Sequence, residues 1–202
     1  MTAPAAPTIE FWFEFGSNYS YLSLMRIEEL ARRAAVRLVW KPFLLGPIFL
    51  ELGWKSPPFV VQREKGEYVW RDMARRAKKY GLPFVRPTVF PRRALLPMRV
   101  ALLGADQPWM GEFCRRVMLR NWAQDLEIDT PAAVLAALDG LVADPSALVR
   151  AAGEEDAKAR LRAQTAAARG LGIFGAPTFL VEGEMFWGDD RLDDALAAAH
   201  EG

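Results

Sequence analysis

The segments of this chain with strand character lie near its two ends, and the long stretch between them carries helical patterns only. Residues 9–15, IEFWFEF, consist of β-branched and aromatic residues with two acids among them, which is typical of a mostly buried strand. Residues 36–43 alternate apolar and basic side chains, and residues 22–34 repeat apolar positions every three or four residues. The N-terminal end therefore predicts a βαβ unit with two parallel strands and a right-handed connection.

The C-terminal end predicts a hairpin followed by a helix. Residues 178–181 form the first expected strand, Glu182-Gly183 is a turn sequence, and residues 185–187 form the returning strand. Asp189 or Asp190 is then expected to cap the last helix. The chain should thus end in an antiparallel ββα unit.

The residues between these two units predict helices throughout. Thr130-Pro131 and Asp144-Pro145 each combine a capping residue with a proline at the first helical position. We therefore expect an inserted helical domain at residues 44–171, within a β/α domain made of residues 8–43 and 172–202.

Composition excludes several chemistries. The chain has one cysteine and one histidine, and the histidine is His200, close to the end of the sequence. These counts exclude a disulfide framework, a Cys/His zinc cluster and a CxxC redox pair, and they disfavour a Ser-His-Asp relay. We therefore expect no metal site, and any enzyme activity needs another way to activate a nucleophile.

Charge and hydropathy exclude further partners. Lysine and arginine number 26 against 25 aspartate and glutamate residues, a net charge of +1, which predicts neither a nucleic-acid partner nor attraction to an acidic membrane. No apolar run approaches the roughly 18 residues of a membrane span, and the first residues, MTAPAAPT, lack the pattern of a signal peptide. We therefore expect a cytoplasmic location.

A βαβ unit at the start and a ββα unit at the end is the arrangement of the thioredoxin fold. In that fold a proline, usually in the cis form, precedes the third strand, and Ala176-Pro177-Thr178-Phe179 occupies this place. A cis proline exposes the backbone N–H and C=O of the preceding residue to an extended peptide. From local sequence alone, Pro177 is equally well explained as a proline that opens a strand.

Ser17 and Ser20 stand where a thioredoxin would carry its two active cysteines. Serine cannot be oxidised, so disulfide exchange is excluded, but a hydroxyl donor remains at a helix N-terminus, where free N–H groups favour an anion. Ser17 is therefore either a simple helix N-cap or the donor of a hydrogen bond to the thiolate of another molecule.

Six sequence stretches then resemble a known family. They are, in order, FWFEFGSNYSYLS, LLGPIF, KGEYVWRD, YGLPF, GAPTF and FWGDDRLDDAL. Their order and spacing resemble the 2-hydroxychromene-2-carboxylate isomerase family, which is related to kappa-class glutathione transferases and to DsbA. The resemblance covers the chain from about residue 9 to its end. It implies a thioredoxin-like domain with a large helical insertion, glutathione as cofactor, and a homodimer.

The resemblance also implies roles for particular residues. Ser17 matches the serine that faces the glutathione sulfur, and it is the expected catalytic residue. Ala176, just before Pro177, matches the residue whose backbone pairs with the cysteinyl part of glutathione. Lys65 matches the lysine that reaches the glycyl carboxylate.

The stretch Asp189-Asp190-Arg191 matches the family's Gly-x-Asp-Arg pattern, in which the second acid holds the γ-glutamyl ammonium group. By this match Asp190 is the acid in question, while Asp189 replaces a residue that is often serine, asparagine or glutamine. Pro177, Asp189, Asp190 and Arg191 are accordingly all expected to belong to the glutathione site. Asn18 replaces the usual proline after the site serine, and Trp54 stands where many relatives carry an asparagine.

The implied function is a glutathione-dependent cis-trans isomerase, in which the thiolate adds reversibly to a conjugated alkene of an aromatic keto acid. The partner would be a small aromatic or alkenyl acid, and no histidine is needed. Two alternatives stay open: a kappa-like glutathione transferase, and a glutathione- or peptide-binding protein without catalysis.

Other residues with chemical potential have structural explanations too. Cys114 is expected to pack inside a helix, and the arginines of residues 86–99 are expected mostly to be solvated or paired with acids. Five aromatic residues could line a substrate cleft or belong to the core: Trp40, Phe43, Phe49, Trp54 and Trp70.

Overall fold

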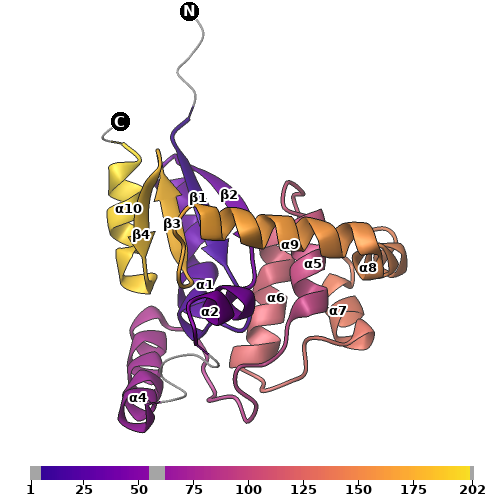
Figure 1. Ribbon diagram of the computed structural model, residues 1–202, viewed down its shortest axis with the longest axis horizontal. Coiled ribbons are helices and arrows are strands. Elements are labelled where there is room, and N and C mark those ends of the chain that lie inside the picture. The colour runs from indigo at the N-terminus through magenta and orange to yellow at the C-terminus, as the bar shows by residue number, and fades with distance from the viewer. Residues whose placement is uncertain (1–5, 55–61, 201–202) are drawn as a thin grey trace, which may run out of the picture.

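The two ends of the chain meet in one sheet. The computed structural model describes residues 6–54 and 62–200, and these form a four-stranded sheet in the order β2-β1-β3-β4 (Figure 1). Strand β1 (Thr8–Phe13) pairs in parallel with β2 (Arg37–Pro42). On its other side β1 pairs antiparallel with β3 (Thr178–Val181), which pairs antiparallel with β4 (Glu184–Trp187). This is the thioredoxin-like topology that the sequence predicts.

Helices surround this sheet and form the insertion. Their bounds are α1 (Asn18–Arg33), α2 (Leu45–Glu51), α4 (Arg63–Tyr80), α5 (Leu95–Leu103), α6 (Met110–Trp122), α7 (Pro131–Leu138), α8 (Pro145–Gly153), α9 (Glu155–Gly170), the 3-10 turn η1 (Asp189–Arg191) and α10 (Leu192–Ala198). The described part of residues 44–171 contains helices and loops and no strand, as expected.

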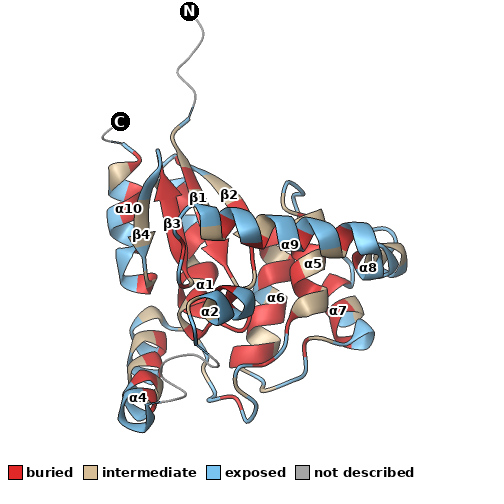
Figure 2. Cartoon of the chain, viewed as in Figure 1, coloured by how far each residue is buried: buried red, intermediate tan, exposed pale blue. Residues whose placement is uncertain are grey.

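Each face of the sheet packs against its own helices. On one face, β1 and β3 contribute to the main core together with α1 and α10, which contact each other. On the other, Trp12 and Leu180 pack with residues of α2 and α9, including Ile48 and Ala168. Figure 2 shows the buried residues running through the strands and along the inward faces of α1, α5 and α6.

The helical insertion shares its core with the sheet. The ring of Phe113 on α6 lies 6.2 Å from that of Phe15, and Trp122 stacks on Tyr21 of α1 at 6.3 Å. The backbone carbonyl of Phe15 accepts hydrogen bonds from Asn121 Nδ2 and Trp122 Nε1, both at 3.1 Å. The domain boundaries at residues 43/44 and 171/172 stay a prediction, but the two parts are packed as one body around the loop that precedes Ser17.

Two of the expected helix caps are present and one is wrong. Thr130 accepts a hydrogen bond from the amide of Ala133 at 3.2 Å, and Asp144 accepts one from Ala147 at 2.8 Å. Neither Asp189 nor Asp190 caps α10, because both lie within the preceding 3-10 turn and the residue at the N-cap is Arg191. Their carboxylates bond to other side chains instead.

We expect Phe113→Ala to lower the free energy of unfolding by about 3–5 kcal/mol, because it empties a fully buried position between α6 and the loop after β1. Chemical denaturation checks this, and the loss should occur in a single transition because the core is shared. Leu171→Ala, at a residue that is 51% exposed, is the control and should change stability by less than about 0.5 kcal/mol. A separate early transition confined to the insertion would contradict the shared core.

Candidate functional site

Ser17 joins the two ends of the chain by a direct hydrogen bond. It is the N-cap of α1, where its Oγ accepts a hydrogen bond from the amide of Ser20 at 3.2 Å. The same hydroxyl donates to the backbone carbonyl of Ala176 at 2.8 Å. The side chain is therefore a helix cap and, in addition, a donor aimed at the loop before β3.

That loop has the backbone form expected from the thioredoxin pattern. The Ala176-Pro177 peptide bond is cis. The carbonyl of Pro177 accepts a hydrogen bond from the amide of Gly188 at 3.0 Å, and Thr178 Oγ1 donates to the carbonyl of Gly175 at 2.9 Å. A side chain at Gly175 would meet the indole nitrogen of Trp187 at 2.3 Å, so only glycine lets this tryptophan close over the loop. The loop is held on both sides.

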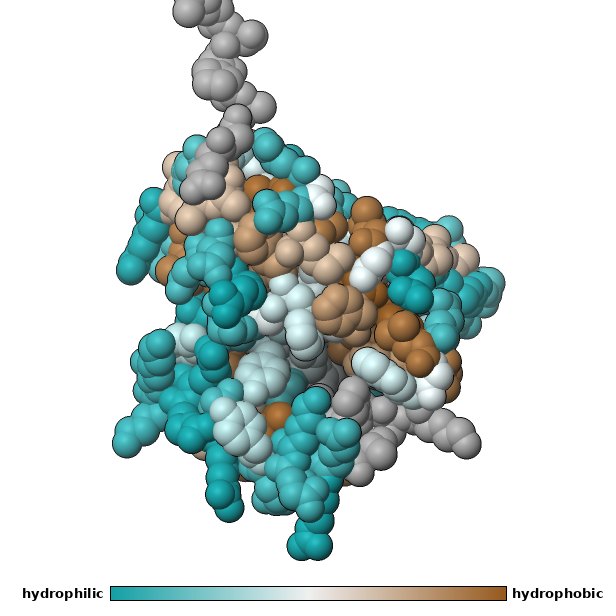
Figure 3. All heavy atoms as spheres, turned by 60° about the vertical axis from the view of Figure 1, so that its left-hand side comes forward, coloured by the Kyte–Doolittle hydropathy of each residue, from teal (hydrophilic) through white to brown (hydrophobic). Residues whose placement is uncertain are grey.

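Ser17 and Ala176 line a cavity of about 930 Å³. Most of its wall is apolar and comes from the α2 region and from residues near β3 and β4: Leu45, Pro47, Phe49, Leu50, Trp54, Phe174 and Trp187. On the face in Figure 3, hydrophobic residues gather in the middle and at the right, and hydrophilic side chains fill the lower part. The cavity can hold a largely apolar molecule against the Ser17 hydroxyl.

The expected cleft aromatics divide between cavity and core. Phe49 and Trp54 line the cavity, with their rings 5.6 Å apart. Trp40 and Phe43 are buried in the core, and Trp70 lines a neighbouring cavity of about 590 Å³. The position at which Trp54 departs from the family pattern therefore forms part of the wall.

Lys65 lines the same cavity from the exposed side of α4. This helix is held against α1 by Asp72, whose carboxylate accepts a hydrogen bond from Tyr19 Oη at 2.8 Å and pairs with Arg76 at 3.3 Å. Burial and the neighbouring Asp72 raise the pKa of the Tyr19 hydroxyl well above its ordinary value. Tyr19 thus stays protonated and keeps donating at neutral pH, so the position of Lys65 is tied to the helix that begins at Ser17.

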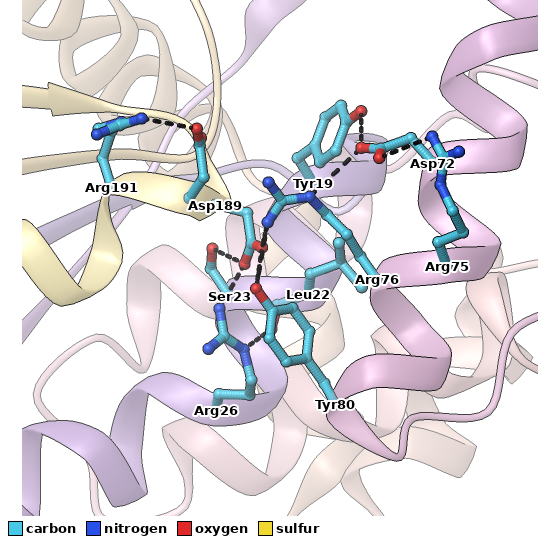
Figure 4. A network of polar contacts seen from close by, with 11 residues as sticks. Tyr19, Leu22, Ser23, Arg26, Asp72, Arg75, Arg76, Tyr80, Asp189 and Arg191 are labelled. Carbon is cyan, nitrogen blue, oxygen red and sulfur yellow. Dashed lines mark hydrogen bonds and ion pairs between the residues drawn. The ribbon is translucent and has the colours of Figure 1, made fainter.

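Asp189 is the centre of a buried polar network (Figure 4). Its Oδ1 accepts hydrogen bonds from Ser23 Oγ at 2.9 Å and Arg26 Nη2 at 2.7 Å. Its Oδ2 accepts from Arg76 Nη1 at 3.2 Å and Tyr80 Oη at 3.1 Å. Only 1% of its side chain is exposed, and the Arg26 guanidinium also lies 3.7 Å from the centre of the Tyr80 ring.

This network argues against a direct ligand contact for Asp189. Both carboxylate oxygens are saturated by partners from α1 and α4, so the residue serves to lock η1 to these two helices. The expectation that Asp189 contacts glutathione is therefore replaced by a positioning role. The sequence pattern assigns the ammonium contact to Asp190, and it does not indicate that the adjacent Asp189 turns inward.

Asp190 and Arg191 lie at the surface. The side chain of Asp190 is 47% exposed and pairs with Arg191 at 3.0 Å, and Arg191 also pairs with Asp194 at 2.8 Å. Neither is among the described residues that line the cavity around Ser17. The carboxylate of Asp190 is thus exposed and paired with Arg191, and the expected contact of these two residues with glutathione stays a prediction.

Two cavity-lining residues carry polar groups without a full set of partners. Asn18 is 3% exposed, and its Nδ2 has no hydrogen-bond partner among the described residues. Glu14 also lines the cavity, and burial raises the pKa of its carboxyl to about 7, against the opposing effect of a hydrogen bond from the amide of Leu45. Sequence reasoning missed Glu14, although an acid among aromatic residues three positions before Ser17 was a visible signal.

Other sequence expectations concern packing. Cys114 is buried against Met110, and burial raises the pKa of its thiol well above the ordinary value, which fits the expected structural role. Arg92 pairs with Asp125, and Arg93 pairs with Asp129. Within residues 6–54 and 62–200 no cluster of potential metal ligands was found, and no helix there is both long and apolar enough to cross a bilayer.

Comparison with known proteins places the chain among thioredoxin-like relatives. The pattern of the DSBA-like thioredoxin domain family matches residues 8–199. A 2-hydroxychromene-2-carboxylate isomerase from Sphingobium xenophagum is 26% identical over 186 residues, 92% of this chain and 94% of the relative. Glutathione S-transferase kappa 1 from Rattus norvegicus is 28% identical over 204 residues, 94% and 89% of the two chains. A solved 2-hydroxychromene-2-carboxylate isomerase structure superposes with a TM-score of 0.84 at 26% identity, covering 96% of this chain and 95% of that one.

The adjacent acids Asp189 and Asp190 offer a matched pair of substitutions. Asp189→Asn should lower the free energy of unfolding by about 3 kcal/mol, because it removes the counter-charge of the partly buried Arg26 and leaves Arg76 with Asp72 alone. Asp190→Asn, at the surface, should change it by less than about 1 kcal/mol. Denaturant unfolding of the two variants checks this, and equal losses would contradict the assignment of a buried anchor to Asp189.

Proposed function

This chain belongs to the DSBA-like thioredoxin domain family, and from that premise we propose that it is a glutathione-dependent isomerase of the 2-hydroxychromene-2-carboxylate isomerase type. Relatives named as isomerases and as glutathione transferases support an enzyme of this general kind. The observation that carries the proposal is the Ser17 hydroxyl at the N-terminus of α1, 2.8 Å from the carbonyl of Ala176 and at the wall of a large cavity. The fold has its usual reactive position, but a hydroxyl replaces the thiol there.

The residues around Ser17 fit glutathione. An N-terminal helix end and a hydroxyl stabilise a thiolate, and the backbone of Ala176 before Pro177 can pair with the peptide-like middle of the molecule. Lys65 is proposed to pair with the glycyl carboxylate, and Asp190 is the acid proposed to hold the γ-glutamyl ammonium. The buried, unpartnered Nδ2 of Asn18 is a further donor at this wall.

Glutathione, when bound, supplies a thiolate that adds reversibly to a conjugated alkene and leaves again after rotation about the resulting single bond. Ser17 is proposed to stabilise the thiolate by donating a hydrogen bond from its hydroxyl group. In this structure the hydroxyl donates to Ala176, so this role requires the hydroxyl hydrogen to turn. The carbonyl of Ala176 then needs another donor, which the amide of an extended peptide can provide.

The apolar wall of the cavity supports a small aromatic or alkenyl acid as the second substrate. Phe49, Trp54 and Trp187 offer ring faces, while polar groups are concentrated near Ser17. A homodimer and a cytoplasmic location are part of this proposal, and they are supported by the family resemblance and by the low cysteine content.

A kappa-like transferase is the second candidate, and the rat relative with 28% identity favours it. The two reactions differ in the fate of glutathione. With 2-hydroxychromene-2-carboxylate as the test substrate, an isomerase leaves the total glutathione concentration unchanged over many turnovers. A transferase acting on an electrophilic probe consumes one glutathione per product. Binding of glutathione without turnover of either probe would support a non-catalytic protein instead.

Ser17→Ala should reduce isomerase activity at least about 100-fold, because it removes the hydrogen-bond donor that stabilises the thiolate. It should also raise the pKa of bound glutathione, which the ultraviolet absorbance of the thiolate measures directly. Loss of the N-cap should cost only about 1 kcal/mol of stability, so the variant is expected to fold.

Ser20→Ala is the matched control. The Ser20 hydroxyl is buried on the same helical turn and has no hydrogen-bond partner among the described residues. Its removal should leave activity and the thiol pKa within about twofold of wild type. Equal activities in the Ser17 and Ser20 variants would refute the proposed site.

Lys65→Met and Asp190→Asn should each weaken glutathione binding by about tenfold, because each removes one charge that complements an end of the ligand. Isothermal titration calorimetry with glutathione measures this. Asp193→Asn, at an exposed acid of α10, should bind as wild type does. Unchanged affinity in both site variants would show that glutathione does not lie between α4 and η1.

A further inference from the structure

Glu14 is a carboxyl group inside the proposed active site for which the mechanism above has no use. It follows β1 directly, and its backbone carbonyl accepts the amide hydrogen bond of Ser17 at 3.1 Å. Its side chain lines the same cavity as Ser17, on the side where α2 begins. A polar group at this position would contact a ligand that fills the apolar half of the cavity.

The orientation of this carboxyl is fixed by the backbone. Its Oε2 accepts a hydrogen bond from the amide of Leu45 at 3.1 Å. The amide of the preceding residue, Leu44, is occupied by Thr165 Oγ1 of α9 at 3.1 Å, so the start of α2 is held in place. Oε2 is thus engaged by one neutral donor, and Oε1 has no hydrogen-bond partner among the residues that the structure describes.

No cation neutralises Glu14 among the residues that the structure describes. Arg92 and Arg93 line the cavity too, but their guanidinium groups pair with Asp125 and Asp129. The other titratable groups at the wall are Tyr19 on α1 and Lys65 and Tyr68 on α4, and α2 contributes only apolar or glycine residues. The carboxyl thus shares the cavity wall mainly with apolar residues, among them Leu45 and Pro47.

Such surroundings favour the neutral acid. Removal from water raises the pKa of the Glu14 carboxyl to about 7, although the hydrogen bond from Leu45 acts in the opposite direction. The protonated form therefore predominates below pH 7, and the ionised form predominates above it. A group that is half protonated near neutral pH can both give and take a proton.

We propose that Glu14 is a catalytic residue, the general acid and base that exchanges a proton with the carbonyl oxygen of the second substrate. The inference rests on the proposed function, because it concerns the substrate whose alkene is isomerised. It assigns that substrate a ketone or aldehyde oxygen directed toward α2, with its apolar part against Phe49 and Trp54.

The proton balance of this role closes within one turnover. When a nucleophile adds to the alkene carbon β to the carbonyl, the π electrons move to the carbonyl oxygen, and Glu14 gives its proton to that oxygen. After rotation, the resulting carboxylate takes the proton back, the C=O bond and the C=C bond re-form, and the nucleophile leaves. Glu14 ends protonated as it began, and no oxidant or reductant is required.

The test is Glu14→Gln, assayed across pH 5–9 with glutathione and 2-hydroxychromene-2-carboxylate, a cyclic hemiketal whose ring-opened form carries the ketone oxygen that the proposal requires. The amide oxygen of glutamine can still accept the Leu45 hydrogen bond, so the fold should be kept. We expect activity to fall about 100-fold. Wild-type activity should decline as pH rises through about 7, where Glu14 loses its proton, and this descending limb should be absent in the variant.

Three further measurements separate the possible failures. Infrared difference spectroscopy of the free proteins should show a carboxylic acid that titrates near pH 7 in wild type and is missing in Glu14→Gln. At pH 5, where Glu14 is protonated in the wild type, the glutathione affinity should be equal in both proteins. If the wild-type protein has no isomerase activity, the proposed function itself is refuted. If the wild type is active and the variant keeps the same pH profile, only the role of Glu14 is refuted.

Glu14→Asp covers the case in which the glutamine variant does not fold. The shorter acid can still exchange a proton, so the descending limb should remain while the rate falls, because the carboxyl no longer reaches its position. A lower rate with no descending limb in either the wild type or Glu14→Asp would refute proton exchange by this residue.

Discussion

The pairing of β1 with β3 is the constraint on which the rest of the structure depends. It joins a strand near residue 10 to one near residue 180, with Trp12 opposite Thr178. This register sets the loop after β1 beside the loop before β3, and the Ser17–Ala176 hydrogen bond follows from it. The helical insertion secures the same place, because two side chains of α6 hold the carbonyl of Phe15. The site thus exists through contacts between segments that are far apart in sequence.

The ion pairs of Asp189 are the second constraint on the geometry of the site. Burying the carboxylate of Asp189 is costly unless its oxygens are satisfied, and it is satisfied by groups from two helices, α1 and α4. The same carboxylate therefore fixes the helix that begins at Ser17 relative to the helix that carries Lys65. A residue without contact to a ligand can in this way decide the distance between two groups proposed to bind it.

Most of the fold could be predicted from sequence, because its signals are local. The strands show as β-branched and aromatic runs, and the caps at Thr130 and Asp144 show as residue pairs with proline. Ser17 and Pro177 could be placed because the order βαβ to ββα determines which loops meet. The separate roles of Asp189 and Asp190 could not be predicted, because they depend on a backbone turn at Gly188, where φ is 112°, and on arginines from distant helices. The role of Glu14 could not be predicted for a similar reason. The acid is visible in the sequence, but its environment is created by α2 and by the apolar cavity wall, which no local pattern describes.

The chemistry of Ser17 and the protonation of Glu14 depend on each other. In the proposed mechanism, a serine at the reactive position requires a thiol supplied from outside, and that thiol acts only as an anion. An ionised carboxylate in the same cavity would repel this anion and raise the thiol pKa. The neutral form of Glu14, which predominates below pH 7, does not repel it, and in the proposed mechanism this form brings a proton to the side of the cavity where negative charge collects on the substrate. The apolar wall from α2 thus has two effects: it suits the apolar substrate proposed here, and it raises the pKa of Glu14, so that at and below neutral pH much of this carboxyl stays in the neutral form that is compatible with a thiolate at Ser17.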